Sequence, residues 1–453
     1  MGILSSIKHL GPLFLYTTGV LLFLRGIAGD GRWALMLVTL LIPLRNVVDK
    51  IQEFPLANQF IDLLVAGALI GCFISCSKQN KSLSTPSSLN IILIILIIYM
   101  SISLLLGNGY LNSPFVFDDR VKDLKNFCLM PLLFYITLNH ITDRTWIIRM
   151  LMTMGLAFLI IDYYTVSQIH DFSTIENREK ISGTFEYLKV NEVAAFFNQY
   201  TIILMSMASF IKDKRVKWAL IALICIDIYC ILGFYSRGAY LGLFAGMFFL
   251  SLFKNRKFLV PLVLLGIFWQ SVLPEKVIER IKQTHDVNGQ LDGSSQGRIE
   301  IWEKGMKLFH ENPLTGIGFG VFRNLGFGLS DTHNIYVKYL AEQGLIGIVI
   351  LLILFLCFLH MGYTLYKKGD DDLNKGMGLG LMACVIVLII NNFFGDRWSY
   401  MEISAYLWIF AGLVARLIIL DQDPKTLPET QQTTKTTADP VQKPRKKLRY
   451  YDL

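Results

Sequence analysis

The stretch GRIEIWEKGMKLFHENPLTGIGFGVFRNLGFGLSDTHNIYVKYLAEQGLIG, from Gly297 to Gly347, decides how the rest of the chain is interpreted. It is the one long segment whose polar and turn residues interrupt a nearly continuous series of apolar runs. In a membrane protein, chemistry on water-soluble groups needs an aqueous face, and ionisable residues there usually mark function. We therefore expect the functional site to include this segment.

The composition of the rest of the chain predicts a membrane protein. Of the 453 residues, 53% are hydrophobic and only 17% are charged, which is too apolar for one soluble core. The formal net charge of +8 then indicates topology and contact with anionic lipids, and nucleic-acid binding is not expected. The seven cysteines lie in or beside apolar runs, so we expect neither a disulfide framework nor a zinc site.

Apolar runs of bilayer length predict an all-α bundle of twelve or thirteen transmembrane helices. They lie near 10–28, 33–46, 59–76, 89–106, 122–138, 146–164, 192–211, 217–234, 238–253, 258–273, 344–366, 376–394 and 402–420. The predicted parts are transmembrane helices over 1–273, a large loop with amphipathic helices over 274–335, transmembrane helices over 336–420 and a disordered basic tail over 421–453.

Clusters of Lys and Arg predict the orientation, because such residues in short loops stay in the cytoplasm. The clusters lie at 212–217, 254–257 and 367–375. They place the 274–335 loop outside, together with the shorter segments 107–121, 165–191, 235–238 and 391–402. We expect these five segments to be able to converge on one site.

Arg298 is the first candidate residue. Ile299, Trp302, Met306 and Phe309 recur at helical spacing, so we expect an amphipathic helix that begins at Arg298 and ends at Asn312-Pro313. A guanidinium beside free N–H groups at a helix start would bind an anion. Alternatively, Arg298 is an interfacial residue that reaches toward lipid phosphate.

The glycines of Gly316-Ile-Gly318-Phe-Gly320 favour a tight turn. A phosphate cradle is the weaker interpretation because no strand precedes them.

His333 is the candidate base. Capping by Asp331 or Ser330 would place His333 in the first turn of the next helix, at the boundary between water and membrane. An ordinary pKa near 6.5 suits imidazole to take a proton from a hydroxyl. A helix-capping or interfacial histidine is the alternative.

Arg237 is a further candidate, because it lies between two apolar runs with no acid in the surrounding turn. A cation placed so usually has a partner from elsewhere, although Arg237 could also be an interfacial anchor. Asp162 and Asp227 lie within apolar runs, where each could serve an ion path or pair with a polar neighbour.

The ordered motifs resemble the signature of the O-antigen ligase and O-antigen polymerase superfamily over about residues 235–347. They are Ser236-Arg237-Gly238-Ala239, then Gly297-Arg298 with Trp302 and Asn312-Pro313-Leu314-x-Gly316-x-Gly318-x-Gly320, then His333-Asn334-x-Tyr336 with Glu342-x-Gly344-Leu345-x-Gly347.

The resemblance implies a multi-pass glycosyltransferase acting on the periplasmic face of the bacterial inner membrane. Its donor would be a glycan on undecaprenyl pyrophosphate, held by Arg237 and Arg298, while His333 would activate the acceptor hydroxyl. The family's further Arg corresponds best to Lys180 here, with Arg178 two residues earlier, and we expect both to act jointly. Fixed guanidinium groups can compensate the pyrophosphate charge, so neither a metal nor a cofactor is expected.

Several functions remain open at this point. A ligase would transfer the glycan to the lipid A core, whereas a polymerase would add it to another lipid-linked repeat unit. A transporter or flippase would use Asp162 and Asp227 for ion coupling. Within glycosyl transfer, Asp118 or Asp119 could replace His333 as the base.

Overall fold

The computed structural model describes residues 2–78, 80, 82, 85–112, 119–172, 174–284, 292–326 and 331–422, and for residues 2–9 and 294 only the backbone. Every regular element in these ranges is a helix. Nine of the helices described are long and apolar enough to cross a membrane. The predicted all-α, multi-pass membrane fold is confirmed at this level, and the count of twelve or thirteen spans stays a prediction.

The nine helices are α1 (Gly2–Ile27), α4 (Phe60–Lys78), α5 (Asn90–Tyr110), α7 (Arg144–Asp171), α8 (Val190–Phe210), α9 (Lys214–Gly233), α15 (Ile335–Lys368), α16 (Asp372–Asn391) and α17 (Met401–Gln422). Shorter or less apolar helices occupy the other four predicted spans: α2 (Arg32–Leu41), α6 (Asp119–His140), α10 (Arg237–Lys254) and α11 (Leu259–Ile267). The remaining helices are α3 (Arg45–Val48), α12 (Trp269–Val272), α13 (Glu275–Lys282), α14 (Gly293–Glu311) and the 3-10 turns η1 (Asp49–Ile51), η2 (Ala57–Gln59), η3 (Arg178–Lys180), η4 (Arg256–Phe258) and η5 (Phe322–Leu325).

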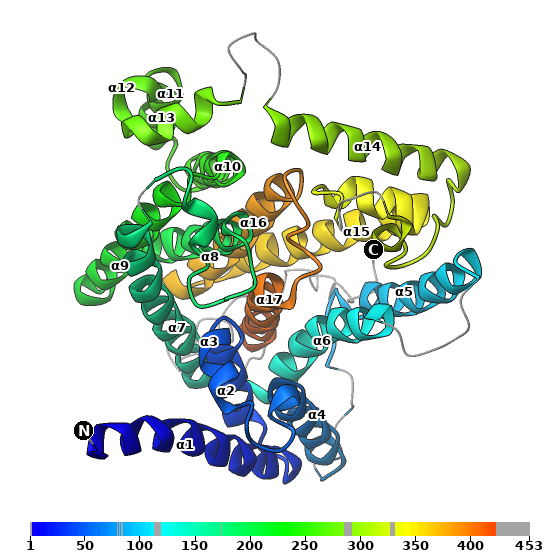
Figure 1. Cartoon of the computed structure of the whole chain (residues 1–453). Helices are drawn as coiled ribbons and strands as arrows, with labels where there is room; N and C mark the ends of the chain where they lie inside the picture. The colour runs from blue at the N-terminus through cyan, green and yellow to red at the C-terminus, as the bar shows by residue number, and fades with distance from the viewer. Residues whose placement is uncertain are drawn as a thin grey trace, which may run out of the picture.

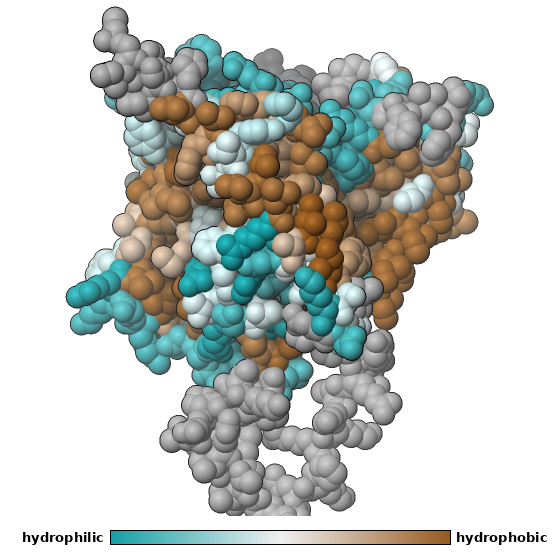
Figure 2. Space-filling model, turned by 90° about the horizontal axis from the view of Figure 1, so that it is seen from below, coloured by the Kyte–Doolittle hydropathy of each residue, from teal (hydrophilic) through white to brown (hydrophobic). Residues whose placement is uncertain are grey.

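The core of the bundle is built around α8, α16 and α17, which lie centrally in Figure 1. Most residues of these three helices are buried, whereas the outer helices expose large apolar side chains. On α5 the exposed residues Ile91, Ile94, Ile98, Ile102 and Leu105 recur at helical spacing, as expected of a face turned to lipid. Broad hydrophobic areas also cover much of the face shown in Figure 2.

The predicted cation clusters lie together at one end of the bundle, which we call the basic end. Lys212 pairs with Asp372 at 3.1 Å, and the Lys254 ammonium lies 3.3 Å from the centre of the Phe210 ring. Because α10 begins at Arg237 and ends at Lys254, Arg237 lies at the opposite end. The bundle therefore separates the clusters from the candidate site, while the assignment of the basic end to the cytoplasm stays a prediction.

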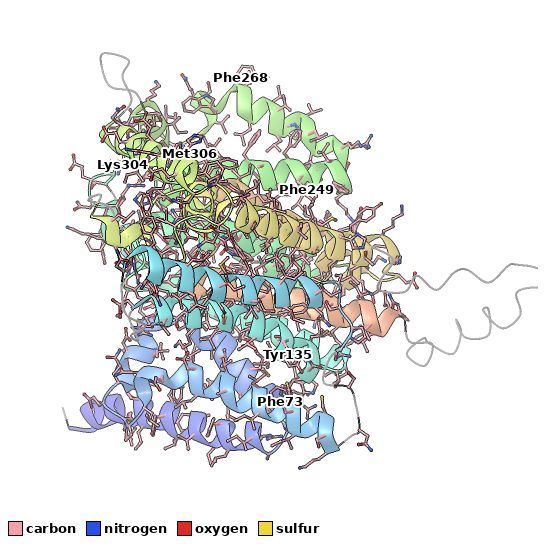
Figure 3. All side chains as sticks on the ribbon, turned by 90° about the vertical axis from the view of Figure 1, so that its right-hand side faces the viewer. Phe73, Tyr135, Phe249, Phe268, Lys304 and Met306 are labelled. Atoms are coloured by element: carbon pink, nitrogen blue, oxygen red, sulfur yellow. The ribbon has the colours of Figure 1, made fainter. Side chains whose placement is uncertain are left out.

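Helix α14 is the predicted amphipathic helix, but it begins earlier than expected. Asp292 caps it by accepting a hydrogen bond from the Ser295 N–H at 3.0 Å, so the helix starts at Gly293 and Arg298 falls in its second turn. The expected anion site on free N–H groups at Arg298 is therefore wrong. The helix ends before Asn312, as predicted, and its residues Lys304 and Met306 lie at one end of the long helices in Figure 3.

The apolar face of α14 packs on the bundle. Its buried residues Ile301 and Leu308 form one cluster with Ile317, Val321 and Phe322 of the following segment. The Trp302 indole donates to the Thr332 carbonyl at 2.9 Å, which fixes α14 against the residue next to His333. These contacts place Arg298 and His333 in one structural unit.

The glycine segment is a turn, as predicted. Gly316, Gly318 and Gly320 all have positive φ, of 67°, 106° and 69°. The N–H groups of Ile317 and Gly318 donate to carbonyls of α15, and the Gly320 N–H donates to the Glu342 carboxylate at 3.1 Å. Because these donors already have protein partners, this turn does not form a phosphate cradle.

The glycine turn packs against the part of α15 that carries the motif Glu342-x-Gly344-Leu345-x-Gly347. Helix α15 is kinked at Gly344, where φ is 63° and ψ is −161°. The N–H groups of Leu345 and Ile346 donate instead to the carbonyls of Pro313 and Leu314, at 2.8 and 3.2 Å. The kink and the glycine turn thus satisfy each other's backbone groups.

Alanine at Gly318 is expected to destabilise the protein by about 2–5 kcal/mol, since left-handed backbone costs roughly 1–2 kcal/mol and overpacking roughly 1–3 kcal/mol. A Cβ there would lie 2.2 Å from the Gly107 backbone. The measurement is the midpoint of thermal unfolding in detergent. Gly297→Ala is the matched control, because a Cβ there meets nothing within 4 Å. Equal midpoints for the two variants would contradict the prediction.

His333 lies just outside α15 and not in its first turn as expected. Asn334 is the N-cap, and its side chain accepts from the Tyr336 and Val337 N–H groups at 3.0 and 3.3 Å. Asparagine is a favoured cap, and Asn334 takes the role that the sequence assigned to Asp331 or Ser330. Residues 327–330 and 423–453, including Ser330 and the predicted basic tail, lie outside the described residues.

Candidate functional site

A cavity of about 220 Å³ lies at the end of the bundle opposite the basic end. Five arginines line it, from η3, α10, α13, α14 and the turn between α16 and α17: Arg178, Arg237, Arg280, Arg298 and Arg397. None of the lining residues is acidic. We call it the arginine cavity, and its concentrated positive charge suits an anionic ligand.

Arg237, the first residue of α10, has partners far away in the sequence. Its Nη1 donates to the Thr284 hydroxyl and its Nη2 to the Asp292 carboxylate, both at 2.9 Å. This agrees with the expectation that the partner comes from elsewhere. Burial raises the pKa of Asp292, but hydrogen bonds from Ser295 and the charge of Arg237 hold it below its usual range. Arg237 therefore connects α10 to the start of α14.

Arg178 lines the arginine cavity and also holds the turn before Arg237. Arg178 is only 7% exposed, and its guanidinium donates to the carbonyls of Tyr235 and Phe234 at 2.6 and 3.3 Å. Lys180 is not among the lining residues, and its ammonium lies 5.4 Å from the centre of the Phe172 ring. The structure thus separates the two cations that the sequence grouped.

Lys180→Ala is expected to leave both transfer activity and thermal stability nearly unchanged, because exposed substitutions usually change stability by about 0.5 kcal/mol or less. Arg178→Ala should lower both, since two carbonyls would lose a buried charged donor. Activity and unfolding midpoints of the two purified variants check this. A loss in Lys180→Ala as large as in Arg178→Ala would contradict it.

Arg280 and Arg397 were not predicted from the sequence. Burial, Arg178 and Arg237 lower the pKa of Arg280 to about 10, a sign of crowded like charges. Arg397 is 3% exposed and pairs with Glu192 of α8. The sequence nevertheless contains a signal for Arg397. It lies in a short turn between two apolar runs, and this turn is one of the five segments predicted to lie outside.

Arg298 has the most available guanidinium of the five. Its guanidinium forms no hydrogen bond or ion pair with any other residue in the described parts of the chain. Burial lowers its pKa, and the charges of Arg397 and Arg237 lower it further. A bound anion would relieve this repulsion and accept the unused N–H donors.

His333 lies in a left-handed backbone conformation, with φ of 52°. Its Nδ1 is 3.8 Å from the Asp331 carboxylate, and its side chain is 29% exposed. Burial lowers the pKa of His333; Asp331 opposes this, while Arg298 and Arg397 lower it again. A lowered pKa favours the neutral imidazole at pH 7, which is the form that accepts a proton.

The other predicted residues lie elsewhere. Asp162 and Asp227 are buried in the helix bundle, where Asp227 accepts from the Thr201 hydroxyl at 2.9 Å, and neither lines the arginine cavity. Asp119 lines a second, larger cavity, whereas Asp118 lies outside the described residues. The roles of all these residues stay predictions.

Comparison with known protein families agrees with the motif order. A family model described as O-antigen ligase matches residues 219–352. This range contains His333 and three of the cavity arginines, Arg237, Arg280 and Arg298. No match was found among curated proteins. The predicted resemblance to the O-antigen ligase superfamily is confirmed.

Proposed function

From the match of residues 219–352 to the O-antigen ligase family, we propose that this protein transfers a glycan from undecaprenyl pyrophosphate to an acceptor hydroxyl. The proposed acceptor is a sugar of the lipid A core, and the proposed place is the periplasmic face of the bacterial inner membrane. The observation that carries this is the arginine cavity, with His333 close enough to Arg298 and Arg397 for their charges to lower its pKa.

In the proposed reaction, the acceptor oxygen attacks the anomeric carbon while His333 takes its proton. The bond between that carbon and the pyrophosphate oxygen breaks, and its electron pair leaves with the pyrophosphate. Arg298 and Arg237 stabilise the charge that develops on the leaving group. A base on the side opposite the leaving group gives inversion at the anomeric carbon.

The proposed transfer needs no divalent metal, because fixed guanidinium groups supply the compensating charge. Purified protein treated with EDTA should therefore keep its activity. Activity lost with EDTA and restored by a divalent cation would overturn this part of the proposal.

The ligase is distinguished from a polymerase by deleting the gene. A ligase predicts that long glycan chains are still made on the undecaprenyl carrier but are missing from lipid A. Loss of the long chains themselves would replace the ligase by the polymerase, which uses the same donor.

A transporter or flippase predicts a different set of sensitive residues. If His333→Ala and Arg298→Ala proteins kept full function and Asp227→Asn abolished it, the enzyme proposal would be wrong. The same experiment tests whether a carboxylate is the base. If Asp119 takes the proton, Asp119→Asn should lose activity while His333→Ala keeps it.

A further inference from the structure

A second cavity of about 600 Å³ lies at the same end of the bundle, lined by parts of α4, α6, α15 and the turn before α17. Its volume is within the roughly 300–1,000 Å³ typical of ligand pockets. Aromatic rings (Phe127, Tyr187, Phe319 and Tyr400) and amides (Asn58 and Asn126) are among the lining residues. We call it the mixed cavity, since apolar, amide and charged groups all face it.

The two cavities share a wall. In the turn between α16 and α17, Arg397 lines the arginine cavity, while its neighbour Asp396 lines the mixed cavity. Asp331 and Thr332 also line the mixed cavity, immediately before His333. His333 in turn lies close enough to Arg298 and Arg397 for their charges to lower its pKa. His333 thus directly follows two residues of the mixed cavity and lies near two arginines of the other.

The charges of the cavities differ in sign. Five arginines and no acid line the arginine cavity, whereas seven carboxylates and five lysines or arginines line the mixed cavity. Several of those cations are already paired with acids of the same lining, as in Lys338–Asp396 at 2.7 Å. A pyrophosphate therefore favours the first cavity, and the second favours a ligand without phosphate.

The lining of the mixed cavity suits the hydroxyl groups of sugars. Ionised carboxylates accept charge-assisted hydrogen bonds from hydroxyls, and amides both donate and accept. The side chains of Asn126 and Tyr400 have no hydrogen-bond partner of their own within the described ranges, so both can bind a ligand. A lining that combines many polar groups with apolar side chains selects a ligand by its shape and its hydrogen bonds.

We propose that the mixed cavity binds the acceptor glycan, through uncharged or amino-bearing sugars, and presents its hydroxyl to His333. This rests on the proposed function and deepens it by giving donor and acceptor separate binding sites. An acceptor on the far side of His333 from the arginine cavity approaches the anomeric carbon opposite the leaving pyrophosphate, as inversion requires. The shared wall then holds both substrates beside one base.

The test uses the full chain in lipid nanodiscs with its native lipid-linked donor and acceptor. Asn126→Ala and Tyr400→Phe should raise the KM for the acceptor by about three- to tenfold, the effect of one lost hydrogen bond. The KM for the donor should not change. Asn191→Ala is the matched control, because this amide lines the arginine cavity, and it should raise the KM for the donor instead. A higher donor KM in Asn126→Ala, or no change in either KM, would overturn the proposal.

A binding experiment keeps this test separate from the proposed function. The probe is the host's core oligosaccharide, released from its lipid by mild acid, and saturation-transfer NMR measures its binding to the nanodisc protein. Binding by wild type and His333→Ala, but weaker binding by Asn126→Ala, supports the mixed cavity whether or not transfer occurs. Absent binding, or equal binding by Asn126→Ala, rejects the cavity even if transfer is confirmed. Transfer that is absent in wild type rejects the proposed function alone.

Discussion

Replacing His333 with alanine is expected to lower the rate of glycosyl transfer by about 10²–10⁴-fold, the usual contribution of a general base. The KM for the donor should change little, because His333 is not among the residues that line the arginine cavity. Initial rates with purified protein and lipid-linked donor measure both parameters. Asn334 should not be chosen as a control, since its cap holds the start of α15. His310→Ala on α14 is a better control, as it changes a histidine outside both cavities.

The pH dependence of the wild type follows from the same residue. Only neutral imidazole accepts a proton, so kcat/KM should fall as the pH drops through the pKa of His333. Since burial and two arginines lower this pKa, the acid limb should lie below the ordinary value of about 6.5. Bound pyrophosphate offsets the arginine charges and favours imidazolium, so the limb of kcat should lie at higher pH than that of kcat/KM. An acid limb of kcat/KM well above pH 6.5 would exclude His333 as the base. So would the same acid limb in the residual activity of His333→Ala.

Sequence patterns predicted much of the candidate site. The order of motifs indicates Arg237, Arg298 and His333, and the structure places all three at the end opposite the basic end. Each motif marks a local feature, such as a positive φ at Gly318 or a cation at a span boundary with no acid nearby in the sequence. Local features of this kind are visible in a short stretch of sequence.

The missed arginines show what local patterns cannot provide. Arg397 reaches the cavity because α16 and α17 pack around α8, whose Glu192 pairs with it across 205 residues. Arg280 lies on an eight-residue helix whose pattern indicates only an amphipathic surface. Lys180 is the best match to the family's further Arg and Arg178 lies two residues earlier, yet η3 directs the two side chains to different partners. Helix packing decides these positions, and hydrophobic periodicity does not specify which helices pack together.

Arg298→Ala is expected to lower kcat/KM for the donor by about 10²–10³-fold, the loss seen when one preorganised donor to a developing charge is removed. The physical reason is that its guanidinium already lies among like charges without a partner in the described residues, so its N–H groups are free for pyrophosphate. Arg298→Lys should recover only part of the activity, because an ammonium keeps the charge but lacks the two-pronged geometry. Removing the arginine should not destabilise the fold, since burial and Arg397 and Arg237 already disfavour its charge.

The expected effect on stability distinguishes Arg298 from Arg178. Arg178→Ala should lose activity together with thermal stability, whereas Arg298→Ala should lose activity alone, and unfolding midpoints measured beside the kinetics show the difference. Arg298→Ala also has an effect that a structural role would not produce. Because the charge of Arg298 lowers the pKa of His333, its removal should move the acid limb of kcat/KM to higher pH. An unchanged limb, with activity lost in proportion to folded protein, would mean that Arg298 neither binds the pyrophosphate nor lies near the base.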